Sequence, residues 1–257
     1  MKFSVCIEMI FRELPFLERI DAVAEAGYPA FEFWGWRTKN LKEILERKRR
    51  YGLDVAAFSV DHQGRLVDYS TKNKFISGLR DALEAAHKLE CPTLLVTTGN
   101  EIEGASRDKQ HESIVKCLRE AAGLAEETDV TLVLEPLNVL VDHRGYYLYS
   151  SREGFEIVNE VNSPKVKLLY DIYHQQIMEG NLIDTITKNI SRIGHFHAAD
   201  VPGRHEPGTG EINYVNVFRS IEKTGYNGYV GLEFKPLRNS KEALRRVMSL
   251  INHPKNN

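Results

Sequence analysis

Short apolar runs alternate with longer amphipathic stretches along the whole sequence. Each apolar run is five or six residues long and rich in Val, Ile, Leu and Phe, a pattern typical of buried strands. We expect eight strands, at residues 3–7, 30–34, 55–60, 93–97, 130–135, 166–171, 193–197 and 229–233.

The stretches between these runs carry apolar residues at helical spacing. The clearest case, residues 41–51, is rich in Glu, Lys and Arg and is followed by Gly52, and glycine commonly follows the last turn of a helix. We expect further helices from residue 16 to near Gly27, and at 73–89, 109–128, 151–161, 182–190, 214–223 and 240–251.

Eight strand–helix units in a row indicate one parallel sheet. An open, doubly wound sheet is the alternative, but no GxGxxG or phosphate-binding loop follows the first strand. The sequence contains no linker rich in Pro, Gly or Ser and no low-complexity tract. We therefore predict an α/β protein with a (β/α)8 TIM barrel, as a single domain over residues 1–257.

Composition and charge restrict the class of protein. Lys and Arg number 34 against 36 Asp and Glu, so the net charge of -2 gives no basic surface for nucleic acid. Three cysteines are too few for a disulfide framework, and no apolar run approaches the roughly 18 residues of a membrane span. We expect a cytoplasmic enzyme whose partner is a small molecule, not a nucleic acid or a membrane. The sequence leaves open whether it is a homo-oligomer.

Four polar residues close the last four predicted strands, namely Glu135, Asp171, His197 and Glu233. Catalysis in a TIM barrel takes place at this end of the strands, and side chains there converge on the barrel axis. Three buried carboxylates repel one another unless a cation lies between them. Three carboxylates and one imidazole predict one divalent metal ion, with Mn²⁺ or Mg²⁺ favoured and Co²⁺ or Zn²⁺ also compatible. The alternative is that each residue ends its strand near solvent or in a salt bridge.

Longer motifs surround these four residues, and with them the chain resembles the xylose-isomerase-like TIM barrels. Within that family it is most similar to the hydroxypyruvate isomerase branch, which is related to the D-tagatose and other ketose 3-epimerases. The resemblance covers almost the whole chain. The motifs that carry it are residues 15–19 (PFLER), 134–138 (LEPLN), 170–174 (YDIYH), 194–197 (GHFH), 202–211 (PGRHEPGTGE) and 231–236 (GLEFKP).

The resemblance implies roles for the residues in these motifs. The four strand-end residues would hold the metal ion. Glu135 and Glu233 would lie on opposite sides of the substrate and transfer protons, although pure metal ligation with water as the base remains the alternative. His174 would bind a substrate oxygen.

Two further cations follow the last two predicted strands. Arg204 lies in a Pro- and Gly-rich loop, where a guanidinium could bind a carboxylate through two hydrogen bonds. Lys235 adds a positive charge near the rim of the barrel. Together with a protonated His174, these residues would offset the negative charge of the metal site. Glu8 and His62 also follow predicted strands, but no role is assigned to them.

These charges favour an anionic substrate. We expect an isomerase that converts hydroxypyruvate to tartronate semialdehyde through an enediolate intermediate. A ketose 3-epimerase is the alternative, because His at position 197 is the pattern of those enzymes, whereas some hydroxypyruvate isomerases have Gln there. A barrel that only binds sugars is less consistent with the two glutamates. An AP endonuclease would need more histidine ligands and a basic surface.

Overall fold

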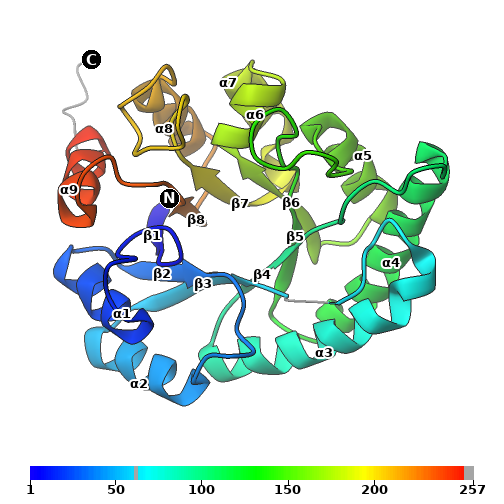
Figure 1. The fold of residues 1–257 in the computed structure, drawn as a ribbon, viewed down its shortest axis with the longest axis horizontal. Coiled ribbons are helices and arrows are strands. Elements are labelled where there is room, and N and C mark those ends of the chain that lie inside the picture. Colours follow the sequence, from blue (N-terminus) through cyan, green and yellow to red (C-terminus); the bar gives the residue numbers. More distant parts are fainter. Residues whose placement is uncertain (61–62, 252–257) are drawn as a thin grey trace.

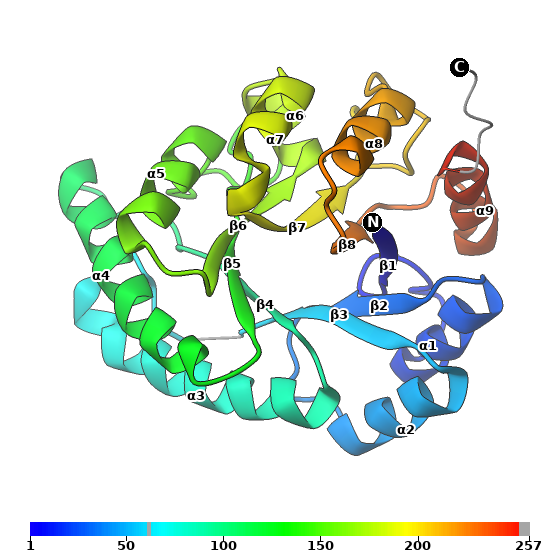
Figure 2. The ribbon, with the colours of Figure 1, turned by 180° about the vertical axis from the view of Figure 1, so that it is seen from behind.

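Eight parallel strands close into a barrel in sequence order, and β1 pairs with both β2 and β8. This computed structural model describes residues 1–60 and 63–251. Figure 1 shows the strands around a common axis, and Figure 2 shows the same ring from behind. The strands are β1 (Lys2–Cys6), β2 (Ala30–Phe33), β3 (Asp54–Ser59), β4 (Thr93–Val96), β5 (Thr131–Leu134), β6 (Val166–Asp171), β7 (Ile193–Ala198) and β8 (Tyr229–Leu232).

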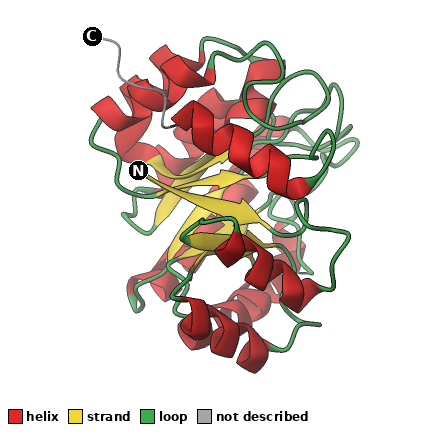
Figure 3. Ribbon diagram, turned by 90° about the vertical axis from the view of Figure 1, so that its left-hand side faces the viewer, coloured by secondary structure: helices red, strands yellow, loops and turns green. Residues whose placement is uncertain are grey.

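Helices follow each strand and surround the barrel, so that the strands lie inside a helical layer (Figure 3). The helices are α1 (Phe16–Glu25), α2 (Leu41–Tyr51), α3 (Lys72–Leu89), α4 (Arg107–Glu126), α5 (Ser151–Val161), α6 (Ile172–Met178), α7 (Leu182–Asn189), α8 (Tyr214–Lys223) and α9 (Ser240–Ile251), with single 3₁₀ turns at Tyr69–Thr71 and Ile190–Arg192. The predicted (β/α)8 TIM barrel is therefore confirmed. Within the described ranges, no helix is both long and apolar enough to span a membrane.

Local sequence signals explain where α2 begins and ends. The Asn40 side chain accepts a hydrogen bond from the Glu43 amide, which satisfies one of the free N–H groups of the first turn. Gly52 follows the last turn with φ of 64°, a left-handed conformation that costs glycine little. The predicted bounds of this helix are confirmed.

The inner face of the barrel is apolar at one level and polar at the next. Successive strand side chains point to opposite faces, so residues two apart share the inner face. Ala57, Leu95, Val133 and Leu169 form a buried apolar cluster inside the barrel. Two residues further along β5 and β6 come Glu135 and Asp171. The apolar cluster thus supports a polar layer at the carboxyl ends of the strands.

Candidate active site

The structure brings the four strand-end residues together. Glu135, Asp171, His197 and Glu233 are all buried, and each offers one ligand atom such that these atoms lie within 4.8 Å of one another. Glu135 and Glu233 follow the last residues of β5 and β8 directly, while Asp171 and His197 belong to β6 and β7. The expected convergence at the barrel axis is therefore present in the structure.

Asp171 uses its two carboxylate oxygens differently. Its Oδ1 accepts hydrogen bonds from the backbone amides of Tyr173 (2.8 Å) and His174 (3.2 Å), which caps α6. Its Oδ2 lies 4.0 Å from His197 Nδ1 and 3.8 Å from Arg204 Nη2. The helix cap fixes the carboxylate and leaves one oxygen directed at the centre of the cluster.

His197 lies next to carboxylates at both of its ring nitrogens. Its Nδ1 faces Glu135 Oε1 at 3.3 Å and Glu233 Oε2 at 3.5 Å, while its Nε2 lies 3.0 Å from Glu32 Oε1. Glu32 is buried on β2, where its other oxygen lies 2.8 Å from Ser4 Oγ and 3.0 Å from His195 Nε2. A carboxylate at Nε2 favours the proton on that nitrogen and leaves Nδ1 available to a metal ion.

Sequence reasoning missed Glu32, although a signal for it was present. A charged residue between Phe31 and Phe33 must point to the face opposite the two rings, which is the barrel interior. Gly231 makes space for it, because a Cβ atom at that position would lie 2.2 Å from Glu32 Oε1. A glutamate in an otherwise apolar strand is therefore the signal by which the carboxylate next to His197 Nε2 could have been found.

The charges of the cluster explain the direction of its pKa shifts. Burial raises the pKa of Glu135 above its ordinary value, and repulsion from Glu233 and Asp171 adds to this rise. Burial likewise raises the pKa of Asp171, against the opposing charges of Arg204 and His197. Burial also opposes ionisation of Glu233, but His197 and Arg204 outweigh it and hold that pKa below its usual range. Three buried carboxylates with one imidazole nitrogen turned toward them form a donor set that fits a divalent cation.

Arg204 reaches into this cluster from the loop after β7. Its guanidinium is largely buried, forms an ion pair with Glu233 and lies 5.3 Å from the centre of the Tyr173 ring. Trp34 Nε1 donates a 2.8 Å hydrogen bond to the other oxygen of Glu233. The Glu233 carboxylate therefore has a donor on each oxygen. The structure places Arg204 against a proposed proton-transfer group, where it can also meet a substrate.

His174 is buried in α6, whereas a protonated side chain was expected at this position from the sequence. Burial lowers its pKa well below the ordinary value, and the nearby charge of Arg204 acts in the same direction. The ring is therefore neutral near pH 7, and the expected contribution of its charge is wrong. Its Nδ1 accepts a 3.2 Å hydrogen bond from the Asn138 amide, which places the proton on Nε2. That Nε2 lies 3.4 Å from Asp171 Oδ2 and has no hydrogen-bond partner, so it faces the site as a donor.

The remaining sequence candidates lie further out. The Lys235 side chain is exposed, while its backbone amide donates a 2.7 Å hydrogen bond to the Arg204 carbonyl oxygen. Glu8 forms an ion pair of 2.7 Å with Lys39, which gives it a role in holding two loops together. His62 lies outside the described residues. Lys235 thus stays a prediction for the rim of the site.

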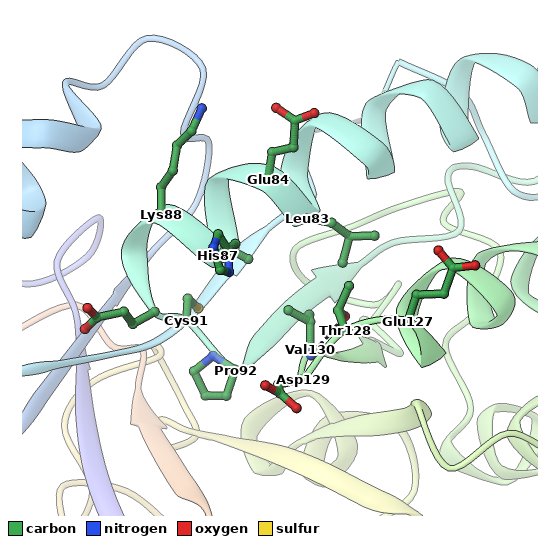
Figure 4. Close-up of a pocket in the computed structure, with 12 residues that line it drawn as sticks. Leu83, Glu84, His87, Lys88, Cys91, Pro92, Glu127, Thr128, Asp129 and Val130 are labelled. Atoms are coloured by element: carbon green, nitrogen blue, oxygen red, sulfur yellow. Dashed lines mark hydrogen bonds between the residues drawn. The ribbon is translucent and has the colours of Figure 1, made fainter.

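A cavity of the structure lies away from the cluster of Glu135, Asp171, His197 and Glu233. A pocket of about 750 Å³ is formed by the end of α3, the start of β4 and the loop before β5. Figure 4 shows Glu84, Lys88 and Glu127 among the residues that line it, together with Leu83, Cys91 and Val130. It lies near the amino ends of β4 and β5, and so at the end of the barrel opposite the carboxylate cluster.

The protein is a TIM barrel. Its eight parallel strands close into a barrel, and a buried cluster of Glu135, Asp171, His197 and Glu233 lies at their carboxyl ends. The family model described as xylose isomerase-like TIM barrel matches residues 20–251. The chain belongs to this family.

Two curated relatives span nearly the same length as this chain. Hydroxypyruvate isomerase of Escherichia coli is 33% identical over 252 residues, covering 95% of this chain and 97% of that protein. A 2-oxo-tetronate isomerase of Haemophilus influenzae is 34% identical over 245 residues, covering 91% and 93%.

Two solved structures have the same architecture. AP endonuclease, family 2, from Brucella melitensis superposes with a TM-score of 0.92 at 31% identity and covers 96% of this chain and 98% of its own. D-psicose 3-epimerase from Clostridium cellulolyticum has a TM-score of 0.82 at 21% identity, covering 98% and 99%. The second likeness concerns the fold alone.

Proposed function

We propose that this isomerase acts on a small hydroxylated 2-keto acid with the help of one divalent cation. Hydroxypyruvate, converted to tartronate semialdehyde, is the substrate we favour. The observation that carries the proposal is the buried cluster in which Glu135 and Glu233 both face the His197 Nδ1 atom, with Arg204 beside them. Hydroxypyruvate and 2-oxo-tetronate, in the names of the two relatives, are both hydroxylated 2-keto acids.

The metal ligands we propose are Glu135, Asp171, His197 and Glu233. Three carboxylates favour Mn²⁺ or Mg²⁺, and the imidazole makes Co²⁺ or Zn²⁺ compatible as well. A cation bound there would polarise the carbonyl group of the substrate.

Proton transfer is assigned to Glu135 and Glu233. The isomerisation removes a proton from C3 of hydroxypyruvate, which gives an enediolate, and returns a proton at C2. Glu233 forms an ion pair with the Arg204 guanidinium, which favours its carboxylate form, so we assign the removal of the proton to it. Glu135 faces the same His197 nitrogen as Glu233, and we assign the return of the proton to it on this geometry.

Substrate binding is assigned to Arg204, His174 and Lys235. His174 presents a neutral Nε2–H donor, which suits a hydroxyl or carbonyl oxygen of the substrate. Since His174 is neutral and Lys235 is exposed, recognition of a substrate carboxylate depends mainly on Arg204. These three residues suit a small anionic molecule as the partner.

A ketose 3-epimerase is the second candidate. The observation that favours it is His197 itself, in the pattern of those enzymes, and the same pair of carboxylates suits proton exchange at C3 of a ketose. Both candidates are tested by assaying the purified protein, supplied with Mn²⁺ or Mg²⁺, on hydroxypyruvate, 2-oxo-tetronate, fructose, tagatose and ribulose. Turnover of the keto acids supports the proposal, whereas epimerisation of free ketoses without turnover of keto acids rejects it in favour of the second candidate.

A further inference from the structure

We propose that Asp200 is a positioning residue that holds Arg204 in place against the carboxylate cluster. Asp200 is fully buried two residues after β7, at the start of the loop that carries Arg204. It touches none of the four cluster residues through its carboxylate. This inference rests on the proposed function only for the role of Arg204.

The Asp200 carboxylate collects five backbone amides of its own loop. Oδ2 accepts hydrogen bonds from Gly208 (2.8 Å), Thr209 (3.0 Å) and Gly210 (2.9 Å). Oδ1 accepts from Val201 (3.0 Å) and Ile212 (3.1 Å). Hydrogen bonds to a charged acceptor are stronger than neutral ones, and five of them on one buried carboxylate order an otherwise irregular segment.

Arg204 lies within this segment, between the Val201 amide on one side and the Gly208 and Ile212 amides on the other, all of which the Asp200 carboxylate holds. The Asp200 amide donates a 2.8 Å hydrogen bond to the His205 carbonyl oxygen, which closes a narrow hairpin whose last turn residue is Arg204. Arg204 has a φ of 59°, which is a left-handed backbone conformation. Residues other than glycine are uncommon there and are held in it by their surroundings. The hairpin is held on its other side by the backbone of Lys235. Asp200 therefore determines the direction of the Arg204 side chain.

Glycines allow the backbone to wrap closely around Asp200. A Cβ atom at Gly210 would lie 2.0 Å from the Val201 carbonyl oxygen and 2.7 Å from Asp200 Oδ1. The amide nitrogens can therefore converge on one carboxylate only because this position lacks a side chain. An asparagine at position 200 would direct an NH₂ group at backbone N–H donors in either orientation of its amide.

The test compares Asp200→Asn with Glu206→Gln as the matched control. Glu206 is a buried carboxylate of the same loop that accepts one backbone amide, from Leu237 at 3.0 Å, and a glutamine oxygen can replace it. In Asp200→Asn we expect amide hydrogen exchange of residues 201–212 to be at least about tenfold faster, because the loop opens locally. In Glu206→Gln we expect exchange close to that of the wild type. Unchanged exchange in Asp200→Asn would overturn the proposal.

The link to Arg204 is tested by a double-mutant cycle with hydroxypyruvate. In the wild-type background we expect Asp200→Asn to lower kcat/KM by at least about tenfold. In the Arg204→Ala background we expect a loss of less than about threefold, because the effects of two coupled substitutions do not add. Equal losses in both backgrounds would overturn the proposal. If Asp200→Asn does not fold, Gly210→Ala disturbs the same loop without changing the carboxylate, and the same cycle applies to it.

The two hypotheses can fail separately. If the wild type converts no hydroxypyruvate, the proposed function is rejected, and a crystal structure of Asp200→Asn still decides the role of Asp200. The guanidinium of Arg204 should then have moved away from Glu233 in the variant. An Arg204–Glu233 ion pair unchanged from the wild type would contradict the proposal.

Discussion

Glu233 is the residue at which the proposed proton transfer can be separated from metal binding. Its two oxygens are held by Trp34 and Arg204, and His197 faces it from β7. Glu233→Gln keeps the shape and some oxygen coordination but removes the basic carboxylate. We expect the variant to bind metal while kcat falls by roughly 10²-fold or more, the usual contribution of general acid–base catalysis. Metal analysis and steady-state kinetics check this, and a variant with metal and near-normal turnover would place the base elsewhere.

Arg204 carries the prediction about substrate charge. A charge-assisted hydrogen bond to a carboxylate contributes about 1.5–3 kcal/mol, so Arg204→Ala should raise KM for hydroxypyruvate by roughly 10- to 150-fold. Lys235→Ala should have a smaller effect, because its exposed charge is screened by solvent. Kinetics of the two variants on hydroxypyruvate, and on any ketose that is turned over, provide the measurement. An equal loss for a neutral ketose would show that Arg204 does not recognise the acid group.

For individual residues, the sequence was sufficient to predict which four form the cluster, but not the charge state or direction of the side chains around it. Alternation along the strands was enough to place Glu135, Asp171, His197 and Glu233 on one face. The neutral state of His174 depends on burial in α6, a helix too short to show a periodic pattern. The direction of Arg204 depends on the conformation of an irregular loop, which no periodicity describes.

Lys48 gives a stability prediction for the contact between α2 and α3. Its buried ammonium donates hydrogen bonds to the Leu89 carbonyl oxygen (2.9 Å) and to Glu90 Oε2 (2.6 Å). Lys48→Met would leave that carbonyl group without a partner, at a cost of about 1–3 kcal/mol in the free energy of unfolding. Lys42→Met on the same helix is the control, because Lys42 is exposed and should change stability by less than about 0.5 kcal/mol. Urea unfolding curves of the three proteins check this, and similar effects of the two substitutions would contradict it.

Glu90 adds a pH dependence at the same contact. Hydrogen bonds from Lys48 and Arg49 lower the pKa of Glu90 from 4.5 to about 2. Because the folded-state pKa is the lower one, this contribution to stability is fully present above pH 4.5 and is lost as the pH falls toward 2. Glu90→Gln should therefore show a weaker loss of stability than the wild type between pH 4.5 and 2. Parallel curves for the two proteins in that range would exclude the effect.

The bounds of four helices were predicted without error. The bounds 41–51, 151–161, 214–223 and 240–251 agree with α2, α5, α8 and α9. Six of the eight predicted strands end one residue beyond the observed end; at Glu135 and Glu233, for example, the ladder of hydrogen bonds already stops at Leu134 and Leu232. α6 was missed, since it begins immediately at Asp171 without a turn between strand and helix.

For the whole molecule, closure of the barrel brings residues far apart in sequence into one buried volume. Glu32 on β2 reaches His197 on β7, and Trp34 reaches Glu233 after β8. Eight repeats of strand and helix were sufficient to predict this closure. They were not sufficient to predict which side chains cross the barrel, because that depends on side-chain length and on the space left by residues such as Gly231.

The central claim, that a metal ion held by this cluster supports isomerisation of a hydroxylated keto acid, is tested most directly in deuterium oxide. The protein is first freed of metal with a chelator, and ¹H NMR then follows hydroxypyruvate before and after addition of Mg²⁺. We predict no conversion before the addition, and afterwards tartronate semialdehyde that carries solvent deuterium on carbon. Conversion that is unaffected by chelation, or no conversion with Mg²⁺ or Mn²⁺ present, would contradict the account.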